Sequence, residues 1–472
     1  MPSPDSQAAR PARPRSLPCR CAGGYGGGMA QDDPKHDVIP AGDEDRRVAG
    51  PSKRRVVVGA DGTLRLPPDE VRRMGGAGAA GGVGDGALEL EIARGPRGIS
   101  LVAGDECLTK VYVELTTECN IACAMCPRNT WAEPGGTMSA GTFGRLVEQL
   151  ADMPAPITVN FSGYGEPMGH ERFWEFLAAA KSAGLEVEIV TNGLLLDEPA
   201  ALRLVELGID RVVVSIDGLS EATSAGLHAG SFPAVAANLR RLYHLRMMRG
   251  AARPELGIEF VATRRNVHEL PRLKSLSQAL GFSSILVTNL IPWSPELCDD
   301  VLYGRPGTLG RGGGPSPEIP RLDVPNFDAN SAASDAIERL RGAGTLLYSN
   351  GRCVSGQSPR CRFVTEGRLA VCWDGSVSPC LPLMHSHEYY FRRRPRQVRH
   401  FHLGNVNAAP LEAIWRSEAY RAFRSRVRQF DFSPCSDCGG CDLRETNQRD
   451  CSSEEFPSCG ECLWAAGIVQ CP

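Results

Sequence analysis

Apolar runs alternate with amphipathic stretches along the middle of the chain, between Lys110 and about Thr288. Each short apolar run predicts a strand, and the stretches between them have apolar positions at helical spacing. Repeated strand–helix units imply a parallel sheet with right-handed crossovers, with functional groups on the loops after the strands. The expected strands are Lys110–Leu115, Thr158–Ser162, Glu186–Thr191, Arg211–Ile216, Gly257–Ala262 and Ser284–Thr288. The expected helices include Phe143–Leu150, Phe173–Ala183, Ala200–Leu207 and Ala234–Met247.

The pattern is different outside this region. Residues 1–50 are rich in Pro, Arg, Gly and Asp and lack periodicity, so we expect them to be disordered. Residues 54–102 contain four short strand-like runs, two of them at Leu88–Ile92 and Gly98–Val102, with a short helix between the pairs. Gly304–Pro320 predicts a connector, and Leu411–Arg428 predicts a helix.

Composition and charge limit the classes of protein that remain. The 472 residues are 42% hydrophobic and 23% charged, which is typical of two or three soluble globular domains. A net charge of −3 argues against a protein that coats nucleic acid. No apolar run approaches the roughly twenty residues of a membrane helix, and residues 1–28 lack the apolar core of a secretory signal. We therefore expect a cytoplasmic protein that does not associate with membranes.

Cysteine is unusually frequent in this chain. Eleven of the eighteen cysteines fall between Cys353 and Cys471, and without a secretion signal metal ligation is a better explanation than disulfides. Three others form the motif Cys119-x3-Cys123-x2-Cys126 directly after the first expected strand. Three thiolates on one loop can hold a cubane iron–sulfur cluster and leave its fourth iron open. Structural zinc prefers four ligands, so an isolated triplet suits it poorly.

The cysteine motif at the end of a strand resembles the signature of the radical S-adenosylmethionine (SAM) enzymes. The resemblance implies a partial (β/α)6 TIM-like barrel whose 4Fe–4S cluster binds SAM, with Cys119, Cys123 and Cys126 as catalytic cluster ligands. Reduction would then cleave SAM to a 5′-deoxyadenosyl radical, which requires a low-potential electron donor such as ferredoxin or flavodoxin.

Later strand ends carry further motifs of this family. Gly163-Tyr-Gly-Glu-Pro167 resembles the GGE motif, in which Glu166 would face the methionine amino group, and Ser215 and Asp217 could bond the ribose or carboxylate. Met125 stands where many members have an aromatic residue near the adenine, and its thioether can cover the ring. The residues expected to bind SAM are Met125, Gly165, Glu166, Pro167, Asn192, Ser215 and Asp217.

The C-terminal cysteines resemble the SPASM extension, which usually carries two auxiliary 4Fe–4S clusters. The resemblance rests on Cys361-x13-Gly375-x4-Cys380 followed by the closely spaced cysteines from Cys435. Cys441 follows Cys438 sooner than in most members, so the division between clusters stays open, as does a zinc ribbon of Cys435/Cys438 with Cys459/Cys462. The candidate ligands are Cys353, Cys361, Cys380, Cys435, Cys438, Cys441, Cys451, Cys459, Cys462 and Cys471.

The N-terminal strands resemble an AbrB-like swapped-hairpin domain, which implies a possible homodimer. With the tail from Asp450, this start resembles the radical SAM maturases of tungsten-containing aldehyde:ferredoxin oxidoreductases. The expected organisation is a disordered segment (1–50), an AbrB-like domain (51–103), a radical SAM core barrel (108–302), a linker (303–345) and a SPASM-like auxiliary iron–sulfur domain (346–472).

Three functions remain open from the sequence. The first is a maturase that modifies a tungsten-dependent oxidoreductase or its cofactor. The second is a ribosomal-peptide-modifying enzyme that forms a thioether or related crosslink, which would use the same cysteines. The third is a DNA-binding iron–sulfur sensor. Residues 46–102 have ten Lys/Arg and six Asp/Glu, a net of 10 − 6 = +4, which permits weak phosphate contact.

Overall fold

The computed structural model describes residues 90–95, 98–103, 107–303 (without 132, 154–155 and 225–231), 321–325, 330, 333, 335–336, 346–349, 352–353 and 361–471 (without 434 and 436–440). The predictions for residues 1–50 and for most of 51–103 lie outside this part of the chain. Within it, β1 (Leu90–Gly95) and β2 (Gly98–Ala103) form an antiparallel hairpin, as the pattern predicts for these two strands. The AbrB-like fold itself stays a prediction.

Six parallel strands form the central part of the sheet, each within two residues of its expected bounds. They are β3 (Lys110–Val113), β4 (Thr158–Phe161), β5 (Glu186–Thr191), β6 (Arg211–Ile216), β7 (Glu255–Ala262) and β8 (Phe282–Asn289). Neighbours in sequence are neighbours in the sheet, so all six carboxyl ends lie at one edge. That edge is where the family resemblance predicts the site.

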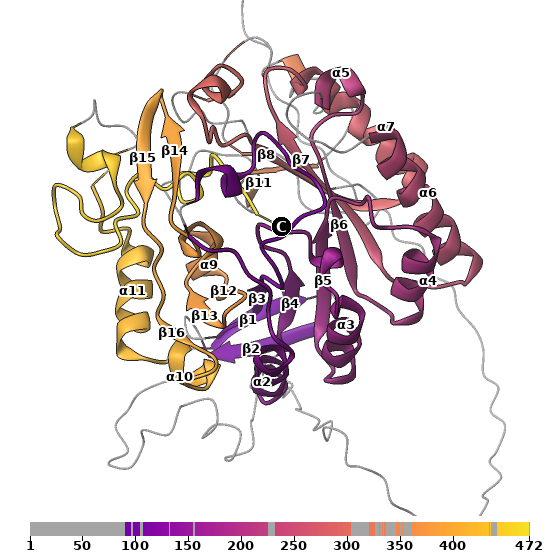
Figure 1. Cartoon of the computed structure of the whole chain (residues 1–472), viewed down its shortest axis with the longest axis horizontal. Helices are drawn as coiled ribbons and strands as arrows, with labels where there is room; N and C mark the ends of the chain where they lie inside the picture. Colours follow the sequence, from indigo (N-terminus) through magenta and orange to yellow (C-terminus); the bar gives the residue numbers. More distant parts are fainter. Residues whose placement is uncertain are drawn as a thin grey trace, which may run out of the picture. The chain divides into compact units, whose positions relative to one another are not determined.

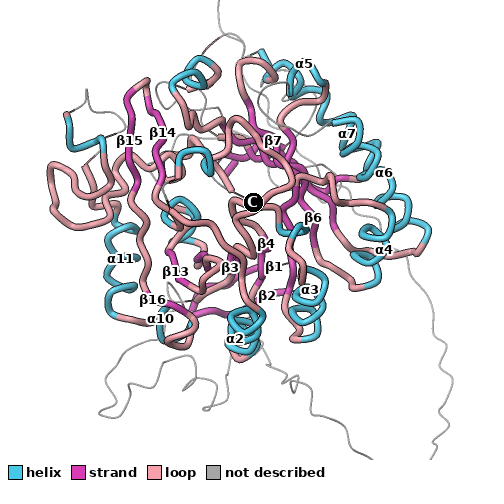
Figure 2. The backbone as a smooth tube through the Cα atoms, viewed as in Figure 1, coloured by secondary structure: helices cyan, strands magenta, loops and turns pink. Residues whose placement is uncertain are grey.

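Helices cover one face of this sheet, which we call the outer face (Figure 2). Residues at alternate strand positions, such as Val111, Val187 and Val212, are buried there in the main hydrophobic core with the apolar faces of the helices. The helices are α2 (Ala140–Ala151), α3 (Phe173–Ser182), α4 (Glu198–Glu206), α5 (Glu221–Ser224), α6 (Phe232–Met248) and α7 (Leu270–Leu280). The four expected helices are confirmed as α2, α3, α4 and α6.

The sheet continues beyond these six strands at both edges (Figure 1). A strand of the C-terminal region, β12 (Arg368–Val371), pairs in parallel with β3, and β13 (Ser376–Ser378) and β16 (Gly404–Asn405) follow it. Beyond β8 lie β9 (Arg321–Asp323), β10 (Leu346–Ser349) and β11 (Arg352–Cys353). The twelve strands therefore join the core and the C-terminal region through backbone hydrogen bonds.

The remaining C-terminal elements are a hairpin and three helices. The hairpin consists of β14 (His387–Phe391) and β15 (Arg394–Val398). The prediction of a single helix over Leu411–Arg428 is wrong, because the structure has two helices there. The first ends at Trp415, and Ser417 caps the second by accepting a hydrogen bond from the Tyr420 N–H. The helices are α9 (Arg362–Thr365), α10 (Leu411–Trp415) and α11 (Glu418–Gln429).

The last described residues lie on the inner face of the sheet, opposite the helices. The Asn289 amide donates to the Ile468 carbonyl at 2.8 Å, and the Gln470 N–H donates to the Thr288 hydroxyl at 2.9 Å. Ile468 and Val469 pack in one apolar cluster with Tyr112 of β3, and Figure 1 shows the chain end amid the strands. Among the described residues, no helix has the length and apolarity needed to cross a membrane.

Candidate functional site

The three motif cysteines lie on the loop that follows β3, at the edge where the strands end. Cys119, Cys123 and Cys126 are each partly exposed. A turn closes the loop, in which the Cys126 N–H donates to the Cys123 carbonyl at 3.2 Å. Partly exposed thiols on one tight loop suit a cluster that is held on one side and open on the other.

Arg128 holds this loop together. Its guanidinium donates to the carbonyls of Thr117 and Ile121, both at 3.1 Å, and its Nε donates to the Cys126 Sγ at 3.2 Å. Burial alone would lower the pKa of Arg128, but the bond to Cys126 and the nearby charges of all three cysteines raise it. The three cysteines therefore lie near one fixed positive charge. For Cys119 burial outweighs this charge, and its pKa is raised.

The loop after β4 packs directly against the cysteine loop. A Cβ on Gly165 would lie 2.1 Å from the Thr116 carbonyl oxygen and 2.5 Å from that of Glu118, so only glycine fits there. The next backbone N–H, that of Glu166, donates to the Glu118 carbonyl at 2.8 Å. Pro167 follows in a buried position. The glycine of this motif thus brings two strand-end loops into contact.

Glu166 connects this loop to the end of β5. Its buried carboxylate accepts from the Thr191 hydroxyl at 2.7 Å, the Asn192 N–H at 2.8 Å and the Met168 N–H at 3.2 Å. The Asn192 amide in turn donates to Asn120 at 2.7 Å and approaches the Cys119 Sγ at 3.8 Å. Glu166 and Asn192 therefore brace the cysteine loop, and their contact with SAM stays a prediction.

The other expected SAM ligands lie farther along the same edge. Ser215 is on the inner face of β6, beside its register partner Glu259 on β7. Asp217 is buried just after β6, and its carbonyl accepts from the Asn266 amide at 2.9 Å. Burial, with a smaller contribution from the Asp217 charge, raises the pKa of Glu259 to about 8. Met125 packs against the apolar cluster of Leu290 and Leu297 beyond β8.

Four C-terminal thiols line one apolar cavity. Cys361, Cys380, Cys459 and Cys462 lie on its wall together with aromatic and aliphatic side chains. Backbone N–H groups point at the sulfurs, from Phe363 and Val364 to Cys361 and from Trp464 and Ala465 to Cys462. Burial raises the pKa of Cys361 to about 12 and those of the other three as well. A dry cavity with four thiols and N–H donors fits a 4Fe–4S cluster.

A second group of thiols lies outside this cavity. Burial raises the pKa of Cys435 to about 11, with nearby charges that include Cys451, whose Sγ lies 3.0 Å from the Ser433 hydroxyl. Cys441 and Cys451 are exposed, and Cys438 lies outside the described residues. The alternative of a zinc ribbon would join Cys435 and Cys438 to Cys459 and Cys462, but the last two line the cavity with Cys361 and Cys380.

Two further candidate cysteines take other places. Cys471 lies by a cavity on the inner face, lined also by Lys110 and Glu188, and its Sγ accepts from the Trp464 indole at 2.9 Å. For Cys353 the structure describes only the backbone, in β11. The structure thus groups Cys471 with the strands rather than with the four-thiol cavity.

Sequence reasoning missed Arg128 and Thr191. Arg128 lies two residues after Cys126, and Thr191 directly precedes Asn192, so their closeness to predicted residues was the available signal. It also missed a buried group of Glu114, Cys372 and His385, which come from distant segments and share no motif.

Two known protein families and several individual proteins are similar to this chain. The radical SAM superfamily matches residues 113–251, and the SPASM iron–sulfur cluster-binding domain matches residues 361–442. The tungsten-containing aldehyde ferredoxin oxidoreductase cofactor-modifying protein of Pyrococcus furiosus is 31% identical over 367 residues, 77% of this chain and 96% of that protein. The PqqA peptide cyclase of Granulibacter bethesdensis is 25% identical over 358 residues, 74% of this chain and 84% of that protein. The structure of Streptococcus suis SuiB bound to S-adenosylmethionine has a TM-score of 0.46 at 12% identity, covering 71% of each chain.

The chain belongs to the radical SAM superfamily of enzymes and carries a SPASM iron–sulfur domain. Membership implies SAM and 4Fe–4S clusters as its cofactors. The loop of Cys119, Cys123 and Cys126 fits the first cluster, because it offers three thiols and not four on one open loop.

Proposed function

We propose that this enzyme is a maturase that modifies a tungsten-dependent oxidoreductase or its cofactor. The observation that carries the proposal is the 31% identity to the Pyrococcus furiosus cofactor-modifying protein, which extends over 96% of that protein. A match over 77% of this chain extends well beyond the cluster motif. The substrate would be a protein or a pterin-type cofactor bound to one.

The chain's own residues would prepare the SAM site before any chemistry occurs. Cys119, Cys123 and Cys126 would hold the cluster, which when reduced supplies the electron that cleaves SAM to a 5′-deoxyadenosyl radical. Arg128 fixes the loop through two carbonyls and one sulfur. Glu166 bonds to Glu118 in this loop and to Asn192 at the end of β5, so it would hold the proposed SAM contacts of Gly165 and Asn192 together.

Two auxiliary clusters are part of the proposal. The four-thiol cavity supports one cluster held by Cys361, Cys380, Cys459 and Cys462. The second would use the remaining neighbours in sequence, which are Cys435, Cys438, Cys441 and Cys451. Such clusters would pass electrons between substrate and a ferredoxin or flavodoxin. We further propose that residues 51–103 form the AbrB-like domain and mediate a homodimer.

The first experiment measures 5′-deoxyadenosine from anaerobically reconstituted protein with dithionite and SAM. We expect product from the wild type, and none from Cys123→Ala, because two thiolates cannot hold a site-differentiated cubane. Cys298→Ser is the matched control, since this partly buried thiol lies outside all the proposed ligand groups, and it should retain full product. No product from wild-type protein with full clusters would contradict the proposal.

A peptide substrate is the second candidate function, and the similarity to a PqqA peptide cyclase favours it. The two can be separated by adding a tungsten-containing oxidoreductase, prepared without this enzyme, or a cysteine-containing precursor peptide. The true substrate should raise the 5′-deoxyadenosine yield above that obtained with SAM and dithionite alone, because the radical then has a bound substrate to react with. Stimulation by the peptide and not by the oxidoreductase would overturn the first candidate.

A further inference from the structure

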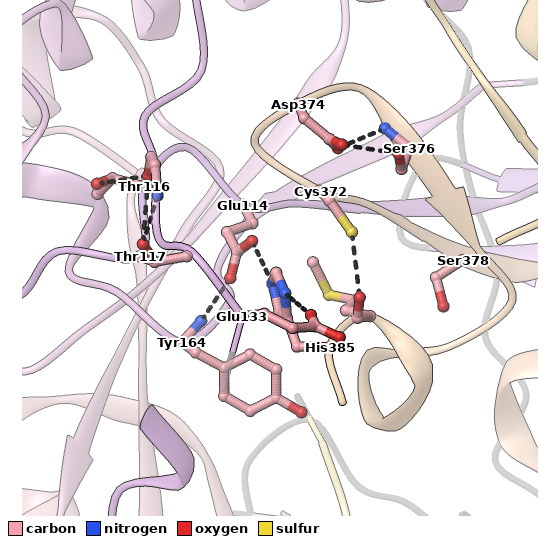
Figure 3. Close-up of polar contacts among 12 residues, drawn as sticks. Glu114, Thr116, Thr117, Glu133, Tyr164, Cys372, Asp374, Ser376, Ser378 and His385 are labelled. Carbon is pink, nitrogen blue, oxygen red and sulfur yellow. Dashed lines mark hydrogen bonds and ion pairs between the residues drawn. The ribbon is translucent and has the colours of Figure 1, made fainter. Parts of the chain in front are cut away.

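A compact group of three ligand-type side chains lies between the core and the C-terminal region, apart from the proposed cluster cysteines. Glu114 follows β3, Cys372 follows β12, and His385 follows the turn after β13 (Figure 3). One carboxylate oxygen, the sulfur and one ring nitrogen all lie within 4.8 Å of one another. We propose that Glu114, Cys372 and His385 bind one divalent metal ion of the zinc type.

Burial distinguishes this group from an ordinary surface cluster. Glu114 is 0% exposed, Cys372 2% and His385 5%. A buried carboxylate is costly unless a positive charge compensates it, whereas a buried neutral thiol is not. A zinc ion would neutralise a carboxylate and a thiolate together, and the neutral imidazole would complete the set.

The donor types select the class of metal. Calcium and magnesium prefer oxygen ligands, whereas sulfur, imidazole nitrogen and carboxylate oxygen together are typical of zinc. Three protein ligands leave one tetrahedral position for water or a substrate group, as in catalytic zinc sites. The site therefore differs from the closed four-cysteine arrangement that structural zinc uses.

Surrounding residues contact the proposed ligands and fix their orientation, as the hydrogen-bond partners of metal ligands commonly do. The Glu133 carboxylate lies 3.3 Å from His385 Nδ1, so Nε2 is the nitrogen directed at Glu114. The Tyr164 N–H donates to Glu114 Oε1 at 3.3 Å, which leaves Oε2 for the metal. The Trp131 ring lies 4.3 Å from the His385 ring and restricts its rotation.

The competing state is a metal-free ion pair. In it, a protonated His385 bridges Glu114, at 2.8 Å, and Glu133, and Cys372 remains a neutral thiol near the Met384 carbonyl at 3.7 Å. Metal binding would release the proton on His385 Nε2 and the thiol proton. The two states differ in metal content, and only the metal-bound state has a metal–sulfur bond. Both differences can be measured.

The test uses full-length, anaerobically purified protein with reconstituted clusters and one added equivalent of zinc. X-ray absorption at the zinc edge does not detect iron, so the clusters do not interfere. We expect one zinc per chain with one sulfur at about 2.3 Å and nitrogen or oxygen ligands at about 2.0–2.2 Å. No retained zinc, or zinc with three or four sulfurs, would overturn the proposal, because the latter would show zinc in a cluster site.

Variants give an independent measurement. Cys372→Ser and His385→Gln should each lose the bound zinc while iron content stays unchanged. Glu133→Gln should weaken zinc binding by about 10–100-fold, as loss of an orienting partner does. Cys298→Ser is again the control and should retain zinc. Zinc content that is unchanged in both ligand variants would place the metal elsewhere and refute the assignment.

Discussion

Gly165 has a packing role in addition to the SAM contact proposed for it. Its missing side chain lets the backbone of the β4 loop approach the carbonyls of Thr116 and Glu118, which directly precede Cys119. The motif predicted a glycine for close approach to SAM. The structure shows that the same glycine is already required for packing the two loops together.

Gly165→Ala should therefore displace the cysteine loop. Its Cβ would lie 2.1 Å from a backbone oxygen, which cannot move without moving the loop. We expect loss of about four irons per chain and a drop of about a hundredfold in 5′-deoxyadenosine formation. Iron analysis and product assay measure both effects.

Gly169→Ala is the matched control for this substitution. It lies four residues later in the same loop, and a Cβ there meets nothing within 4 Å. The control should keep its iron and its activity. Equal behaviour of the two variants would show that loop packing does not set the geometry of the cysteines.

Strands are the elements that the sequence predicts well, because each short apolar run has one face against the helices. The pattern of β5, alternately buried and partly exposed, corresponds to alternating residues in the sequence. Helix ends were predicted less well. The amphipathic pattern from Leu411 continues across Ser417, but the serine side chain caps a new helix and breaks the expected one.

Charged residues on the inner face join three of these strands. The Lys110 ammonium on β3 bonds to the Glu188 carboxylate on β5, which also accepts from the Asn160 amide at 2.9 Å and lies 3.7 Å from Arg211. The side chains of Lys110 and Glu188 are 11% and 14% exposed. Removing one partner of a buried ion pair leaves the other charge uncompensated. Loss of either side chain should therefore destabilise the fold.

Glu188→Gln should lower the free energy of unfolding by about 3 kcal/mol, because Lys110 would stay buried without its charge partner. Thermal and urea unfolding under anaerobic conditions measure the change. Glu206→Gln is the control, since its pair with Arg249 is about half exposed, and it should change stability by less than about 0.5 kcal/mol. A small effect at Glu188 would mean that water reaches the pair.

Lys110→Met should remove a dependence of stability on pH. Burial lowers the pKa of Lys110 to about 8, against the opposing effect of Glu188. Because this folded pKa is below the unfolded value of 10.5, the unfolded chain binds more protons between the two, and wild-type stability gains about 3 kcal/mol as pH rises from 8 to 10.5. The variant should lack this rise, and parallel curves for both proteins would contradict the assignment.

The whole molecule depends on contacts between distant parts of the chain. β12 completes the sheet at β3, and the segment up to Cys471 packs on the inner face. In the described residues the first strand of the core has a partner from the C-terminal region. An exposed β3 edge would leave unpaired backbone groups and favour aggregation.

A fragment of residues 107–303 should therefore fail to fold cooperatively, although it contains all six core strands. We expect it to be aggregated or digested rapidly by trypsin. A fragment of residues 107–471 is the control and should unfold in one transition, like the full chain. A soluble 107–303 fragment with a sharp unfolding transition would show that the core does not need β12.

The sequence alone determined where the core strands lie along the chain, the cysteine loop and the motifs at the strand ends. Periodicity and spacing are local properties of the chain. Arg128 and the bracing role of Glu166 required the structure, since several strand ends must meet before their side chains can bond. Only the tertiary structure grouped Cys459 and Cys462 with Cys361 and Cys380, and Glu114 with Cys372 and His385. These contacts join residues about 80 to 270 positions apart, and spacing carries no information about them.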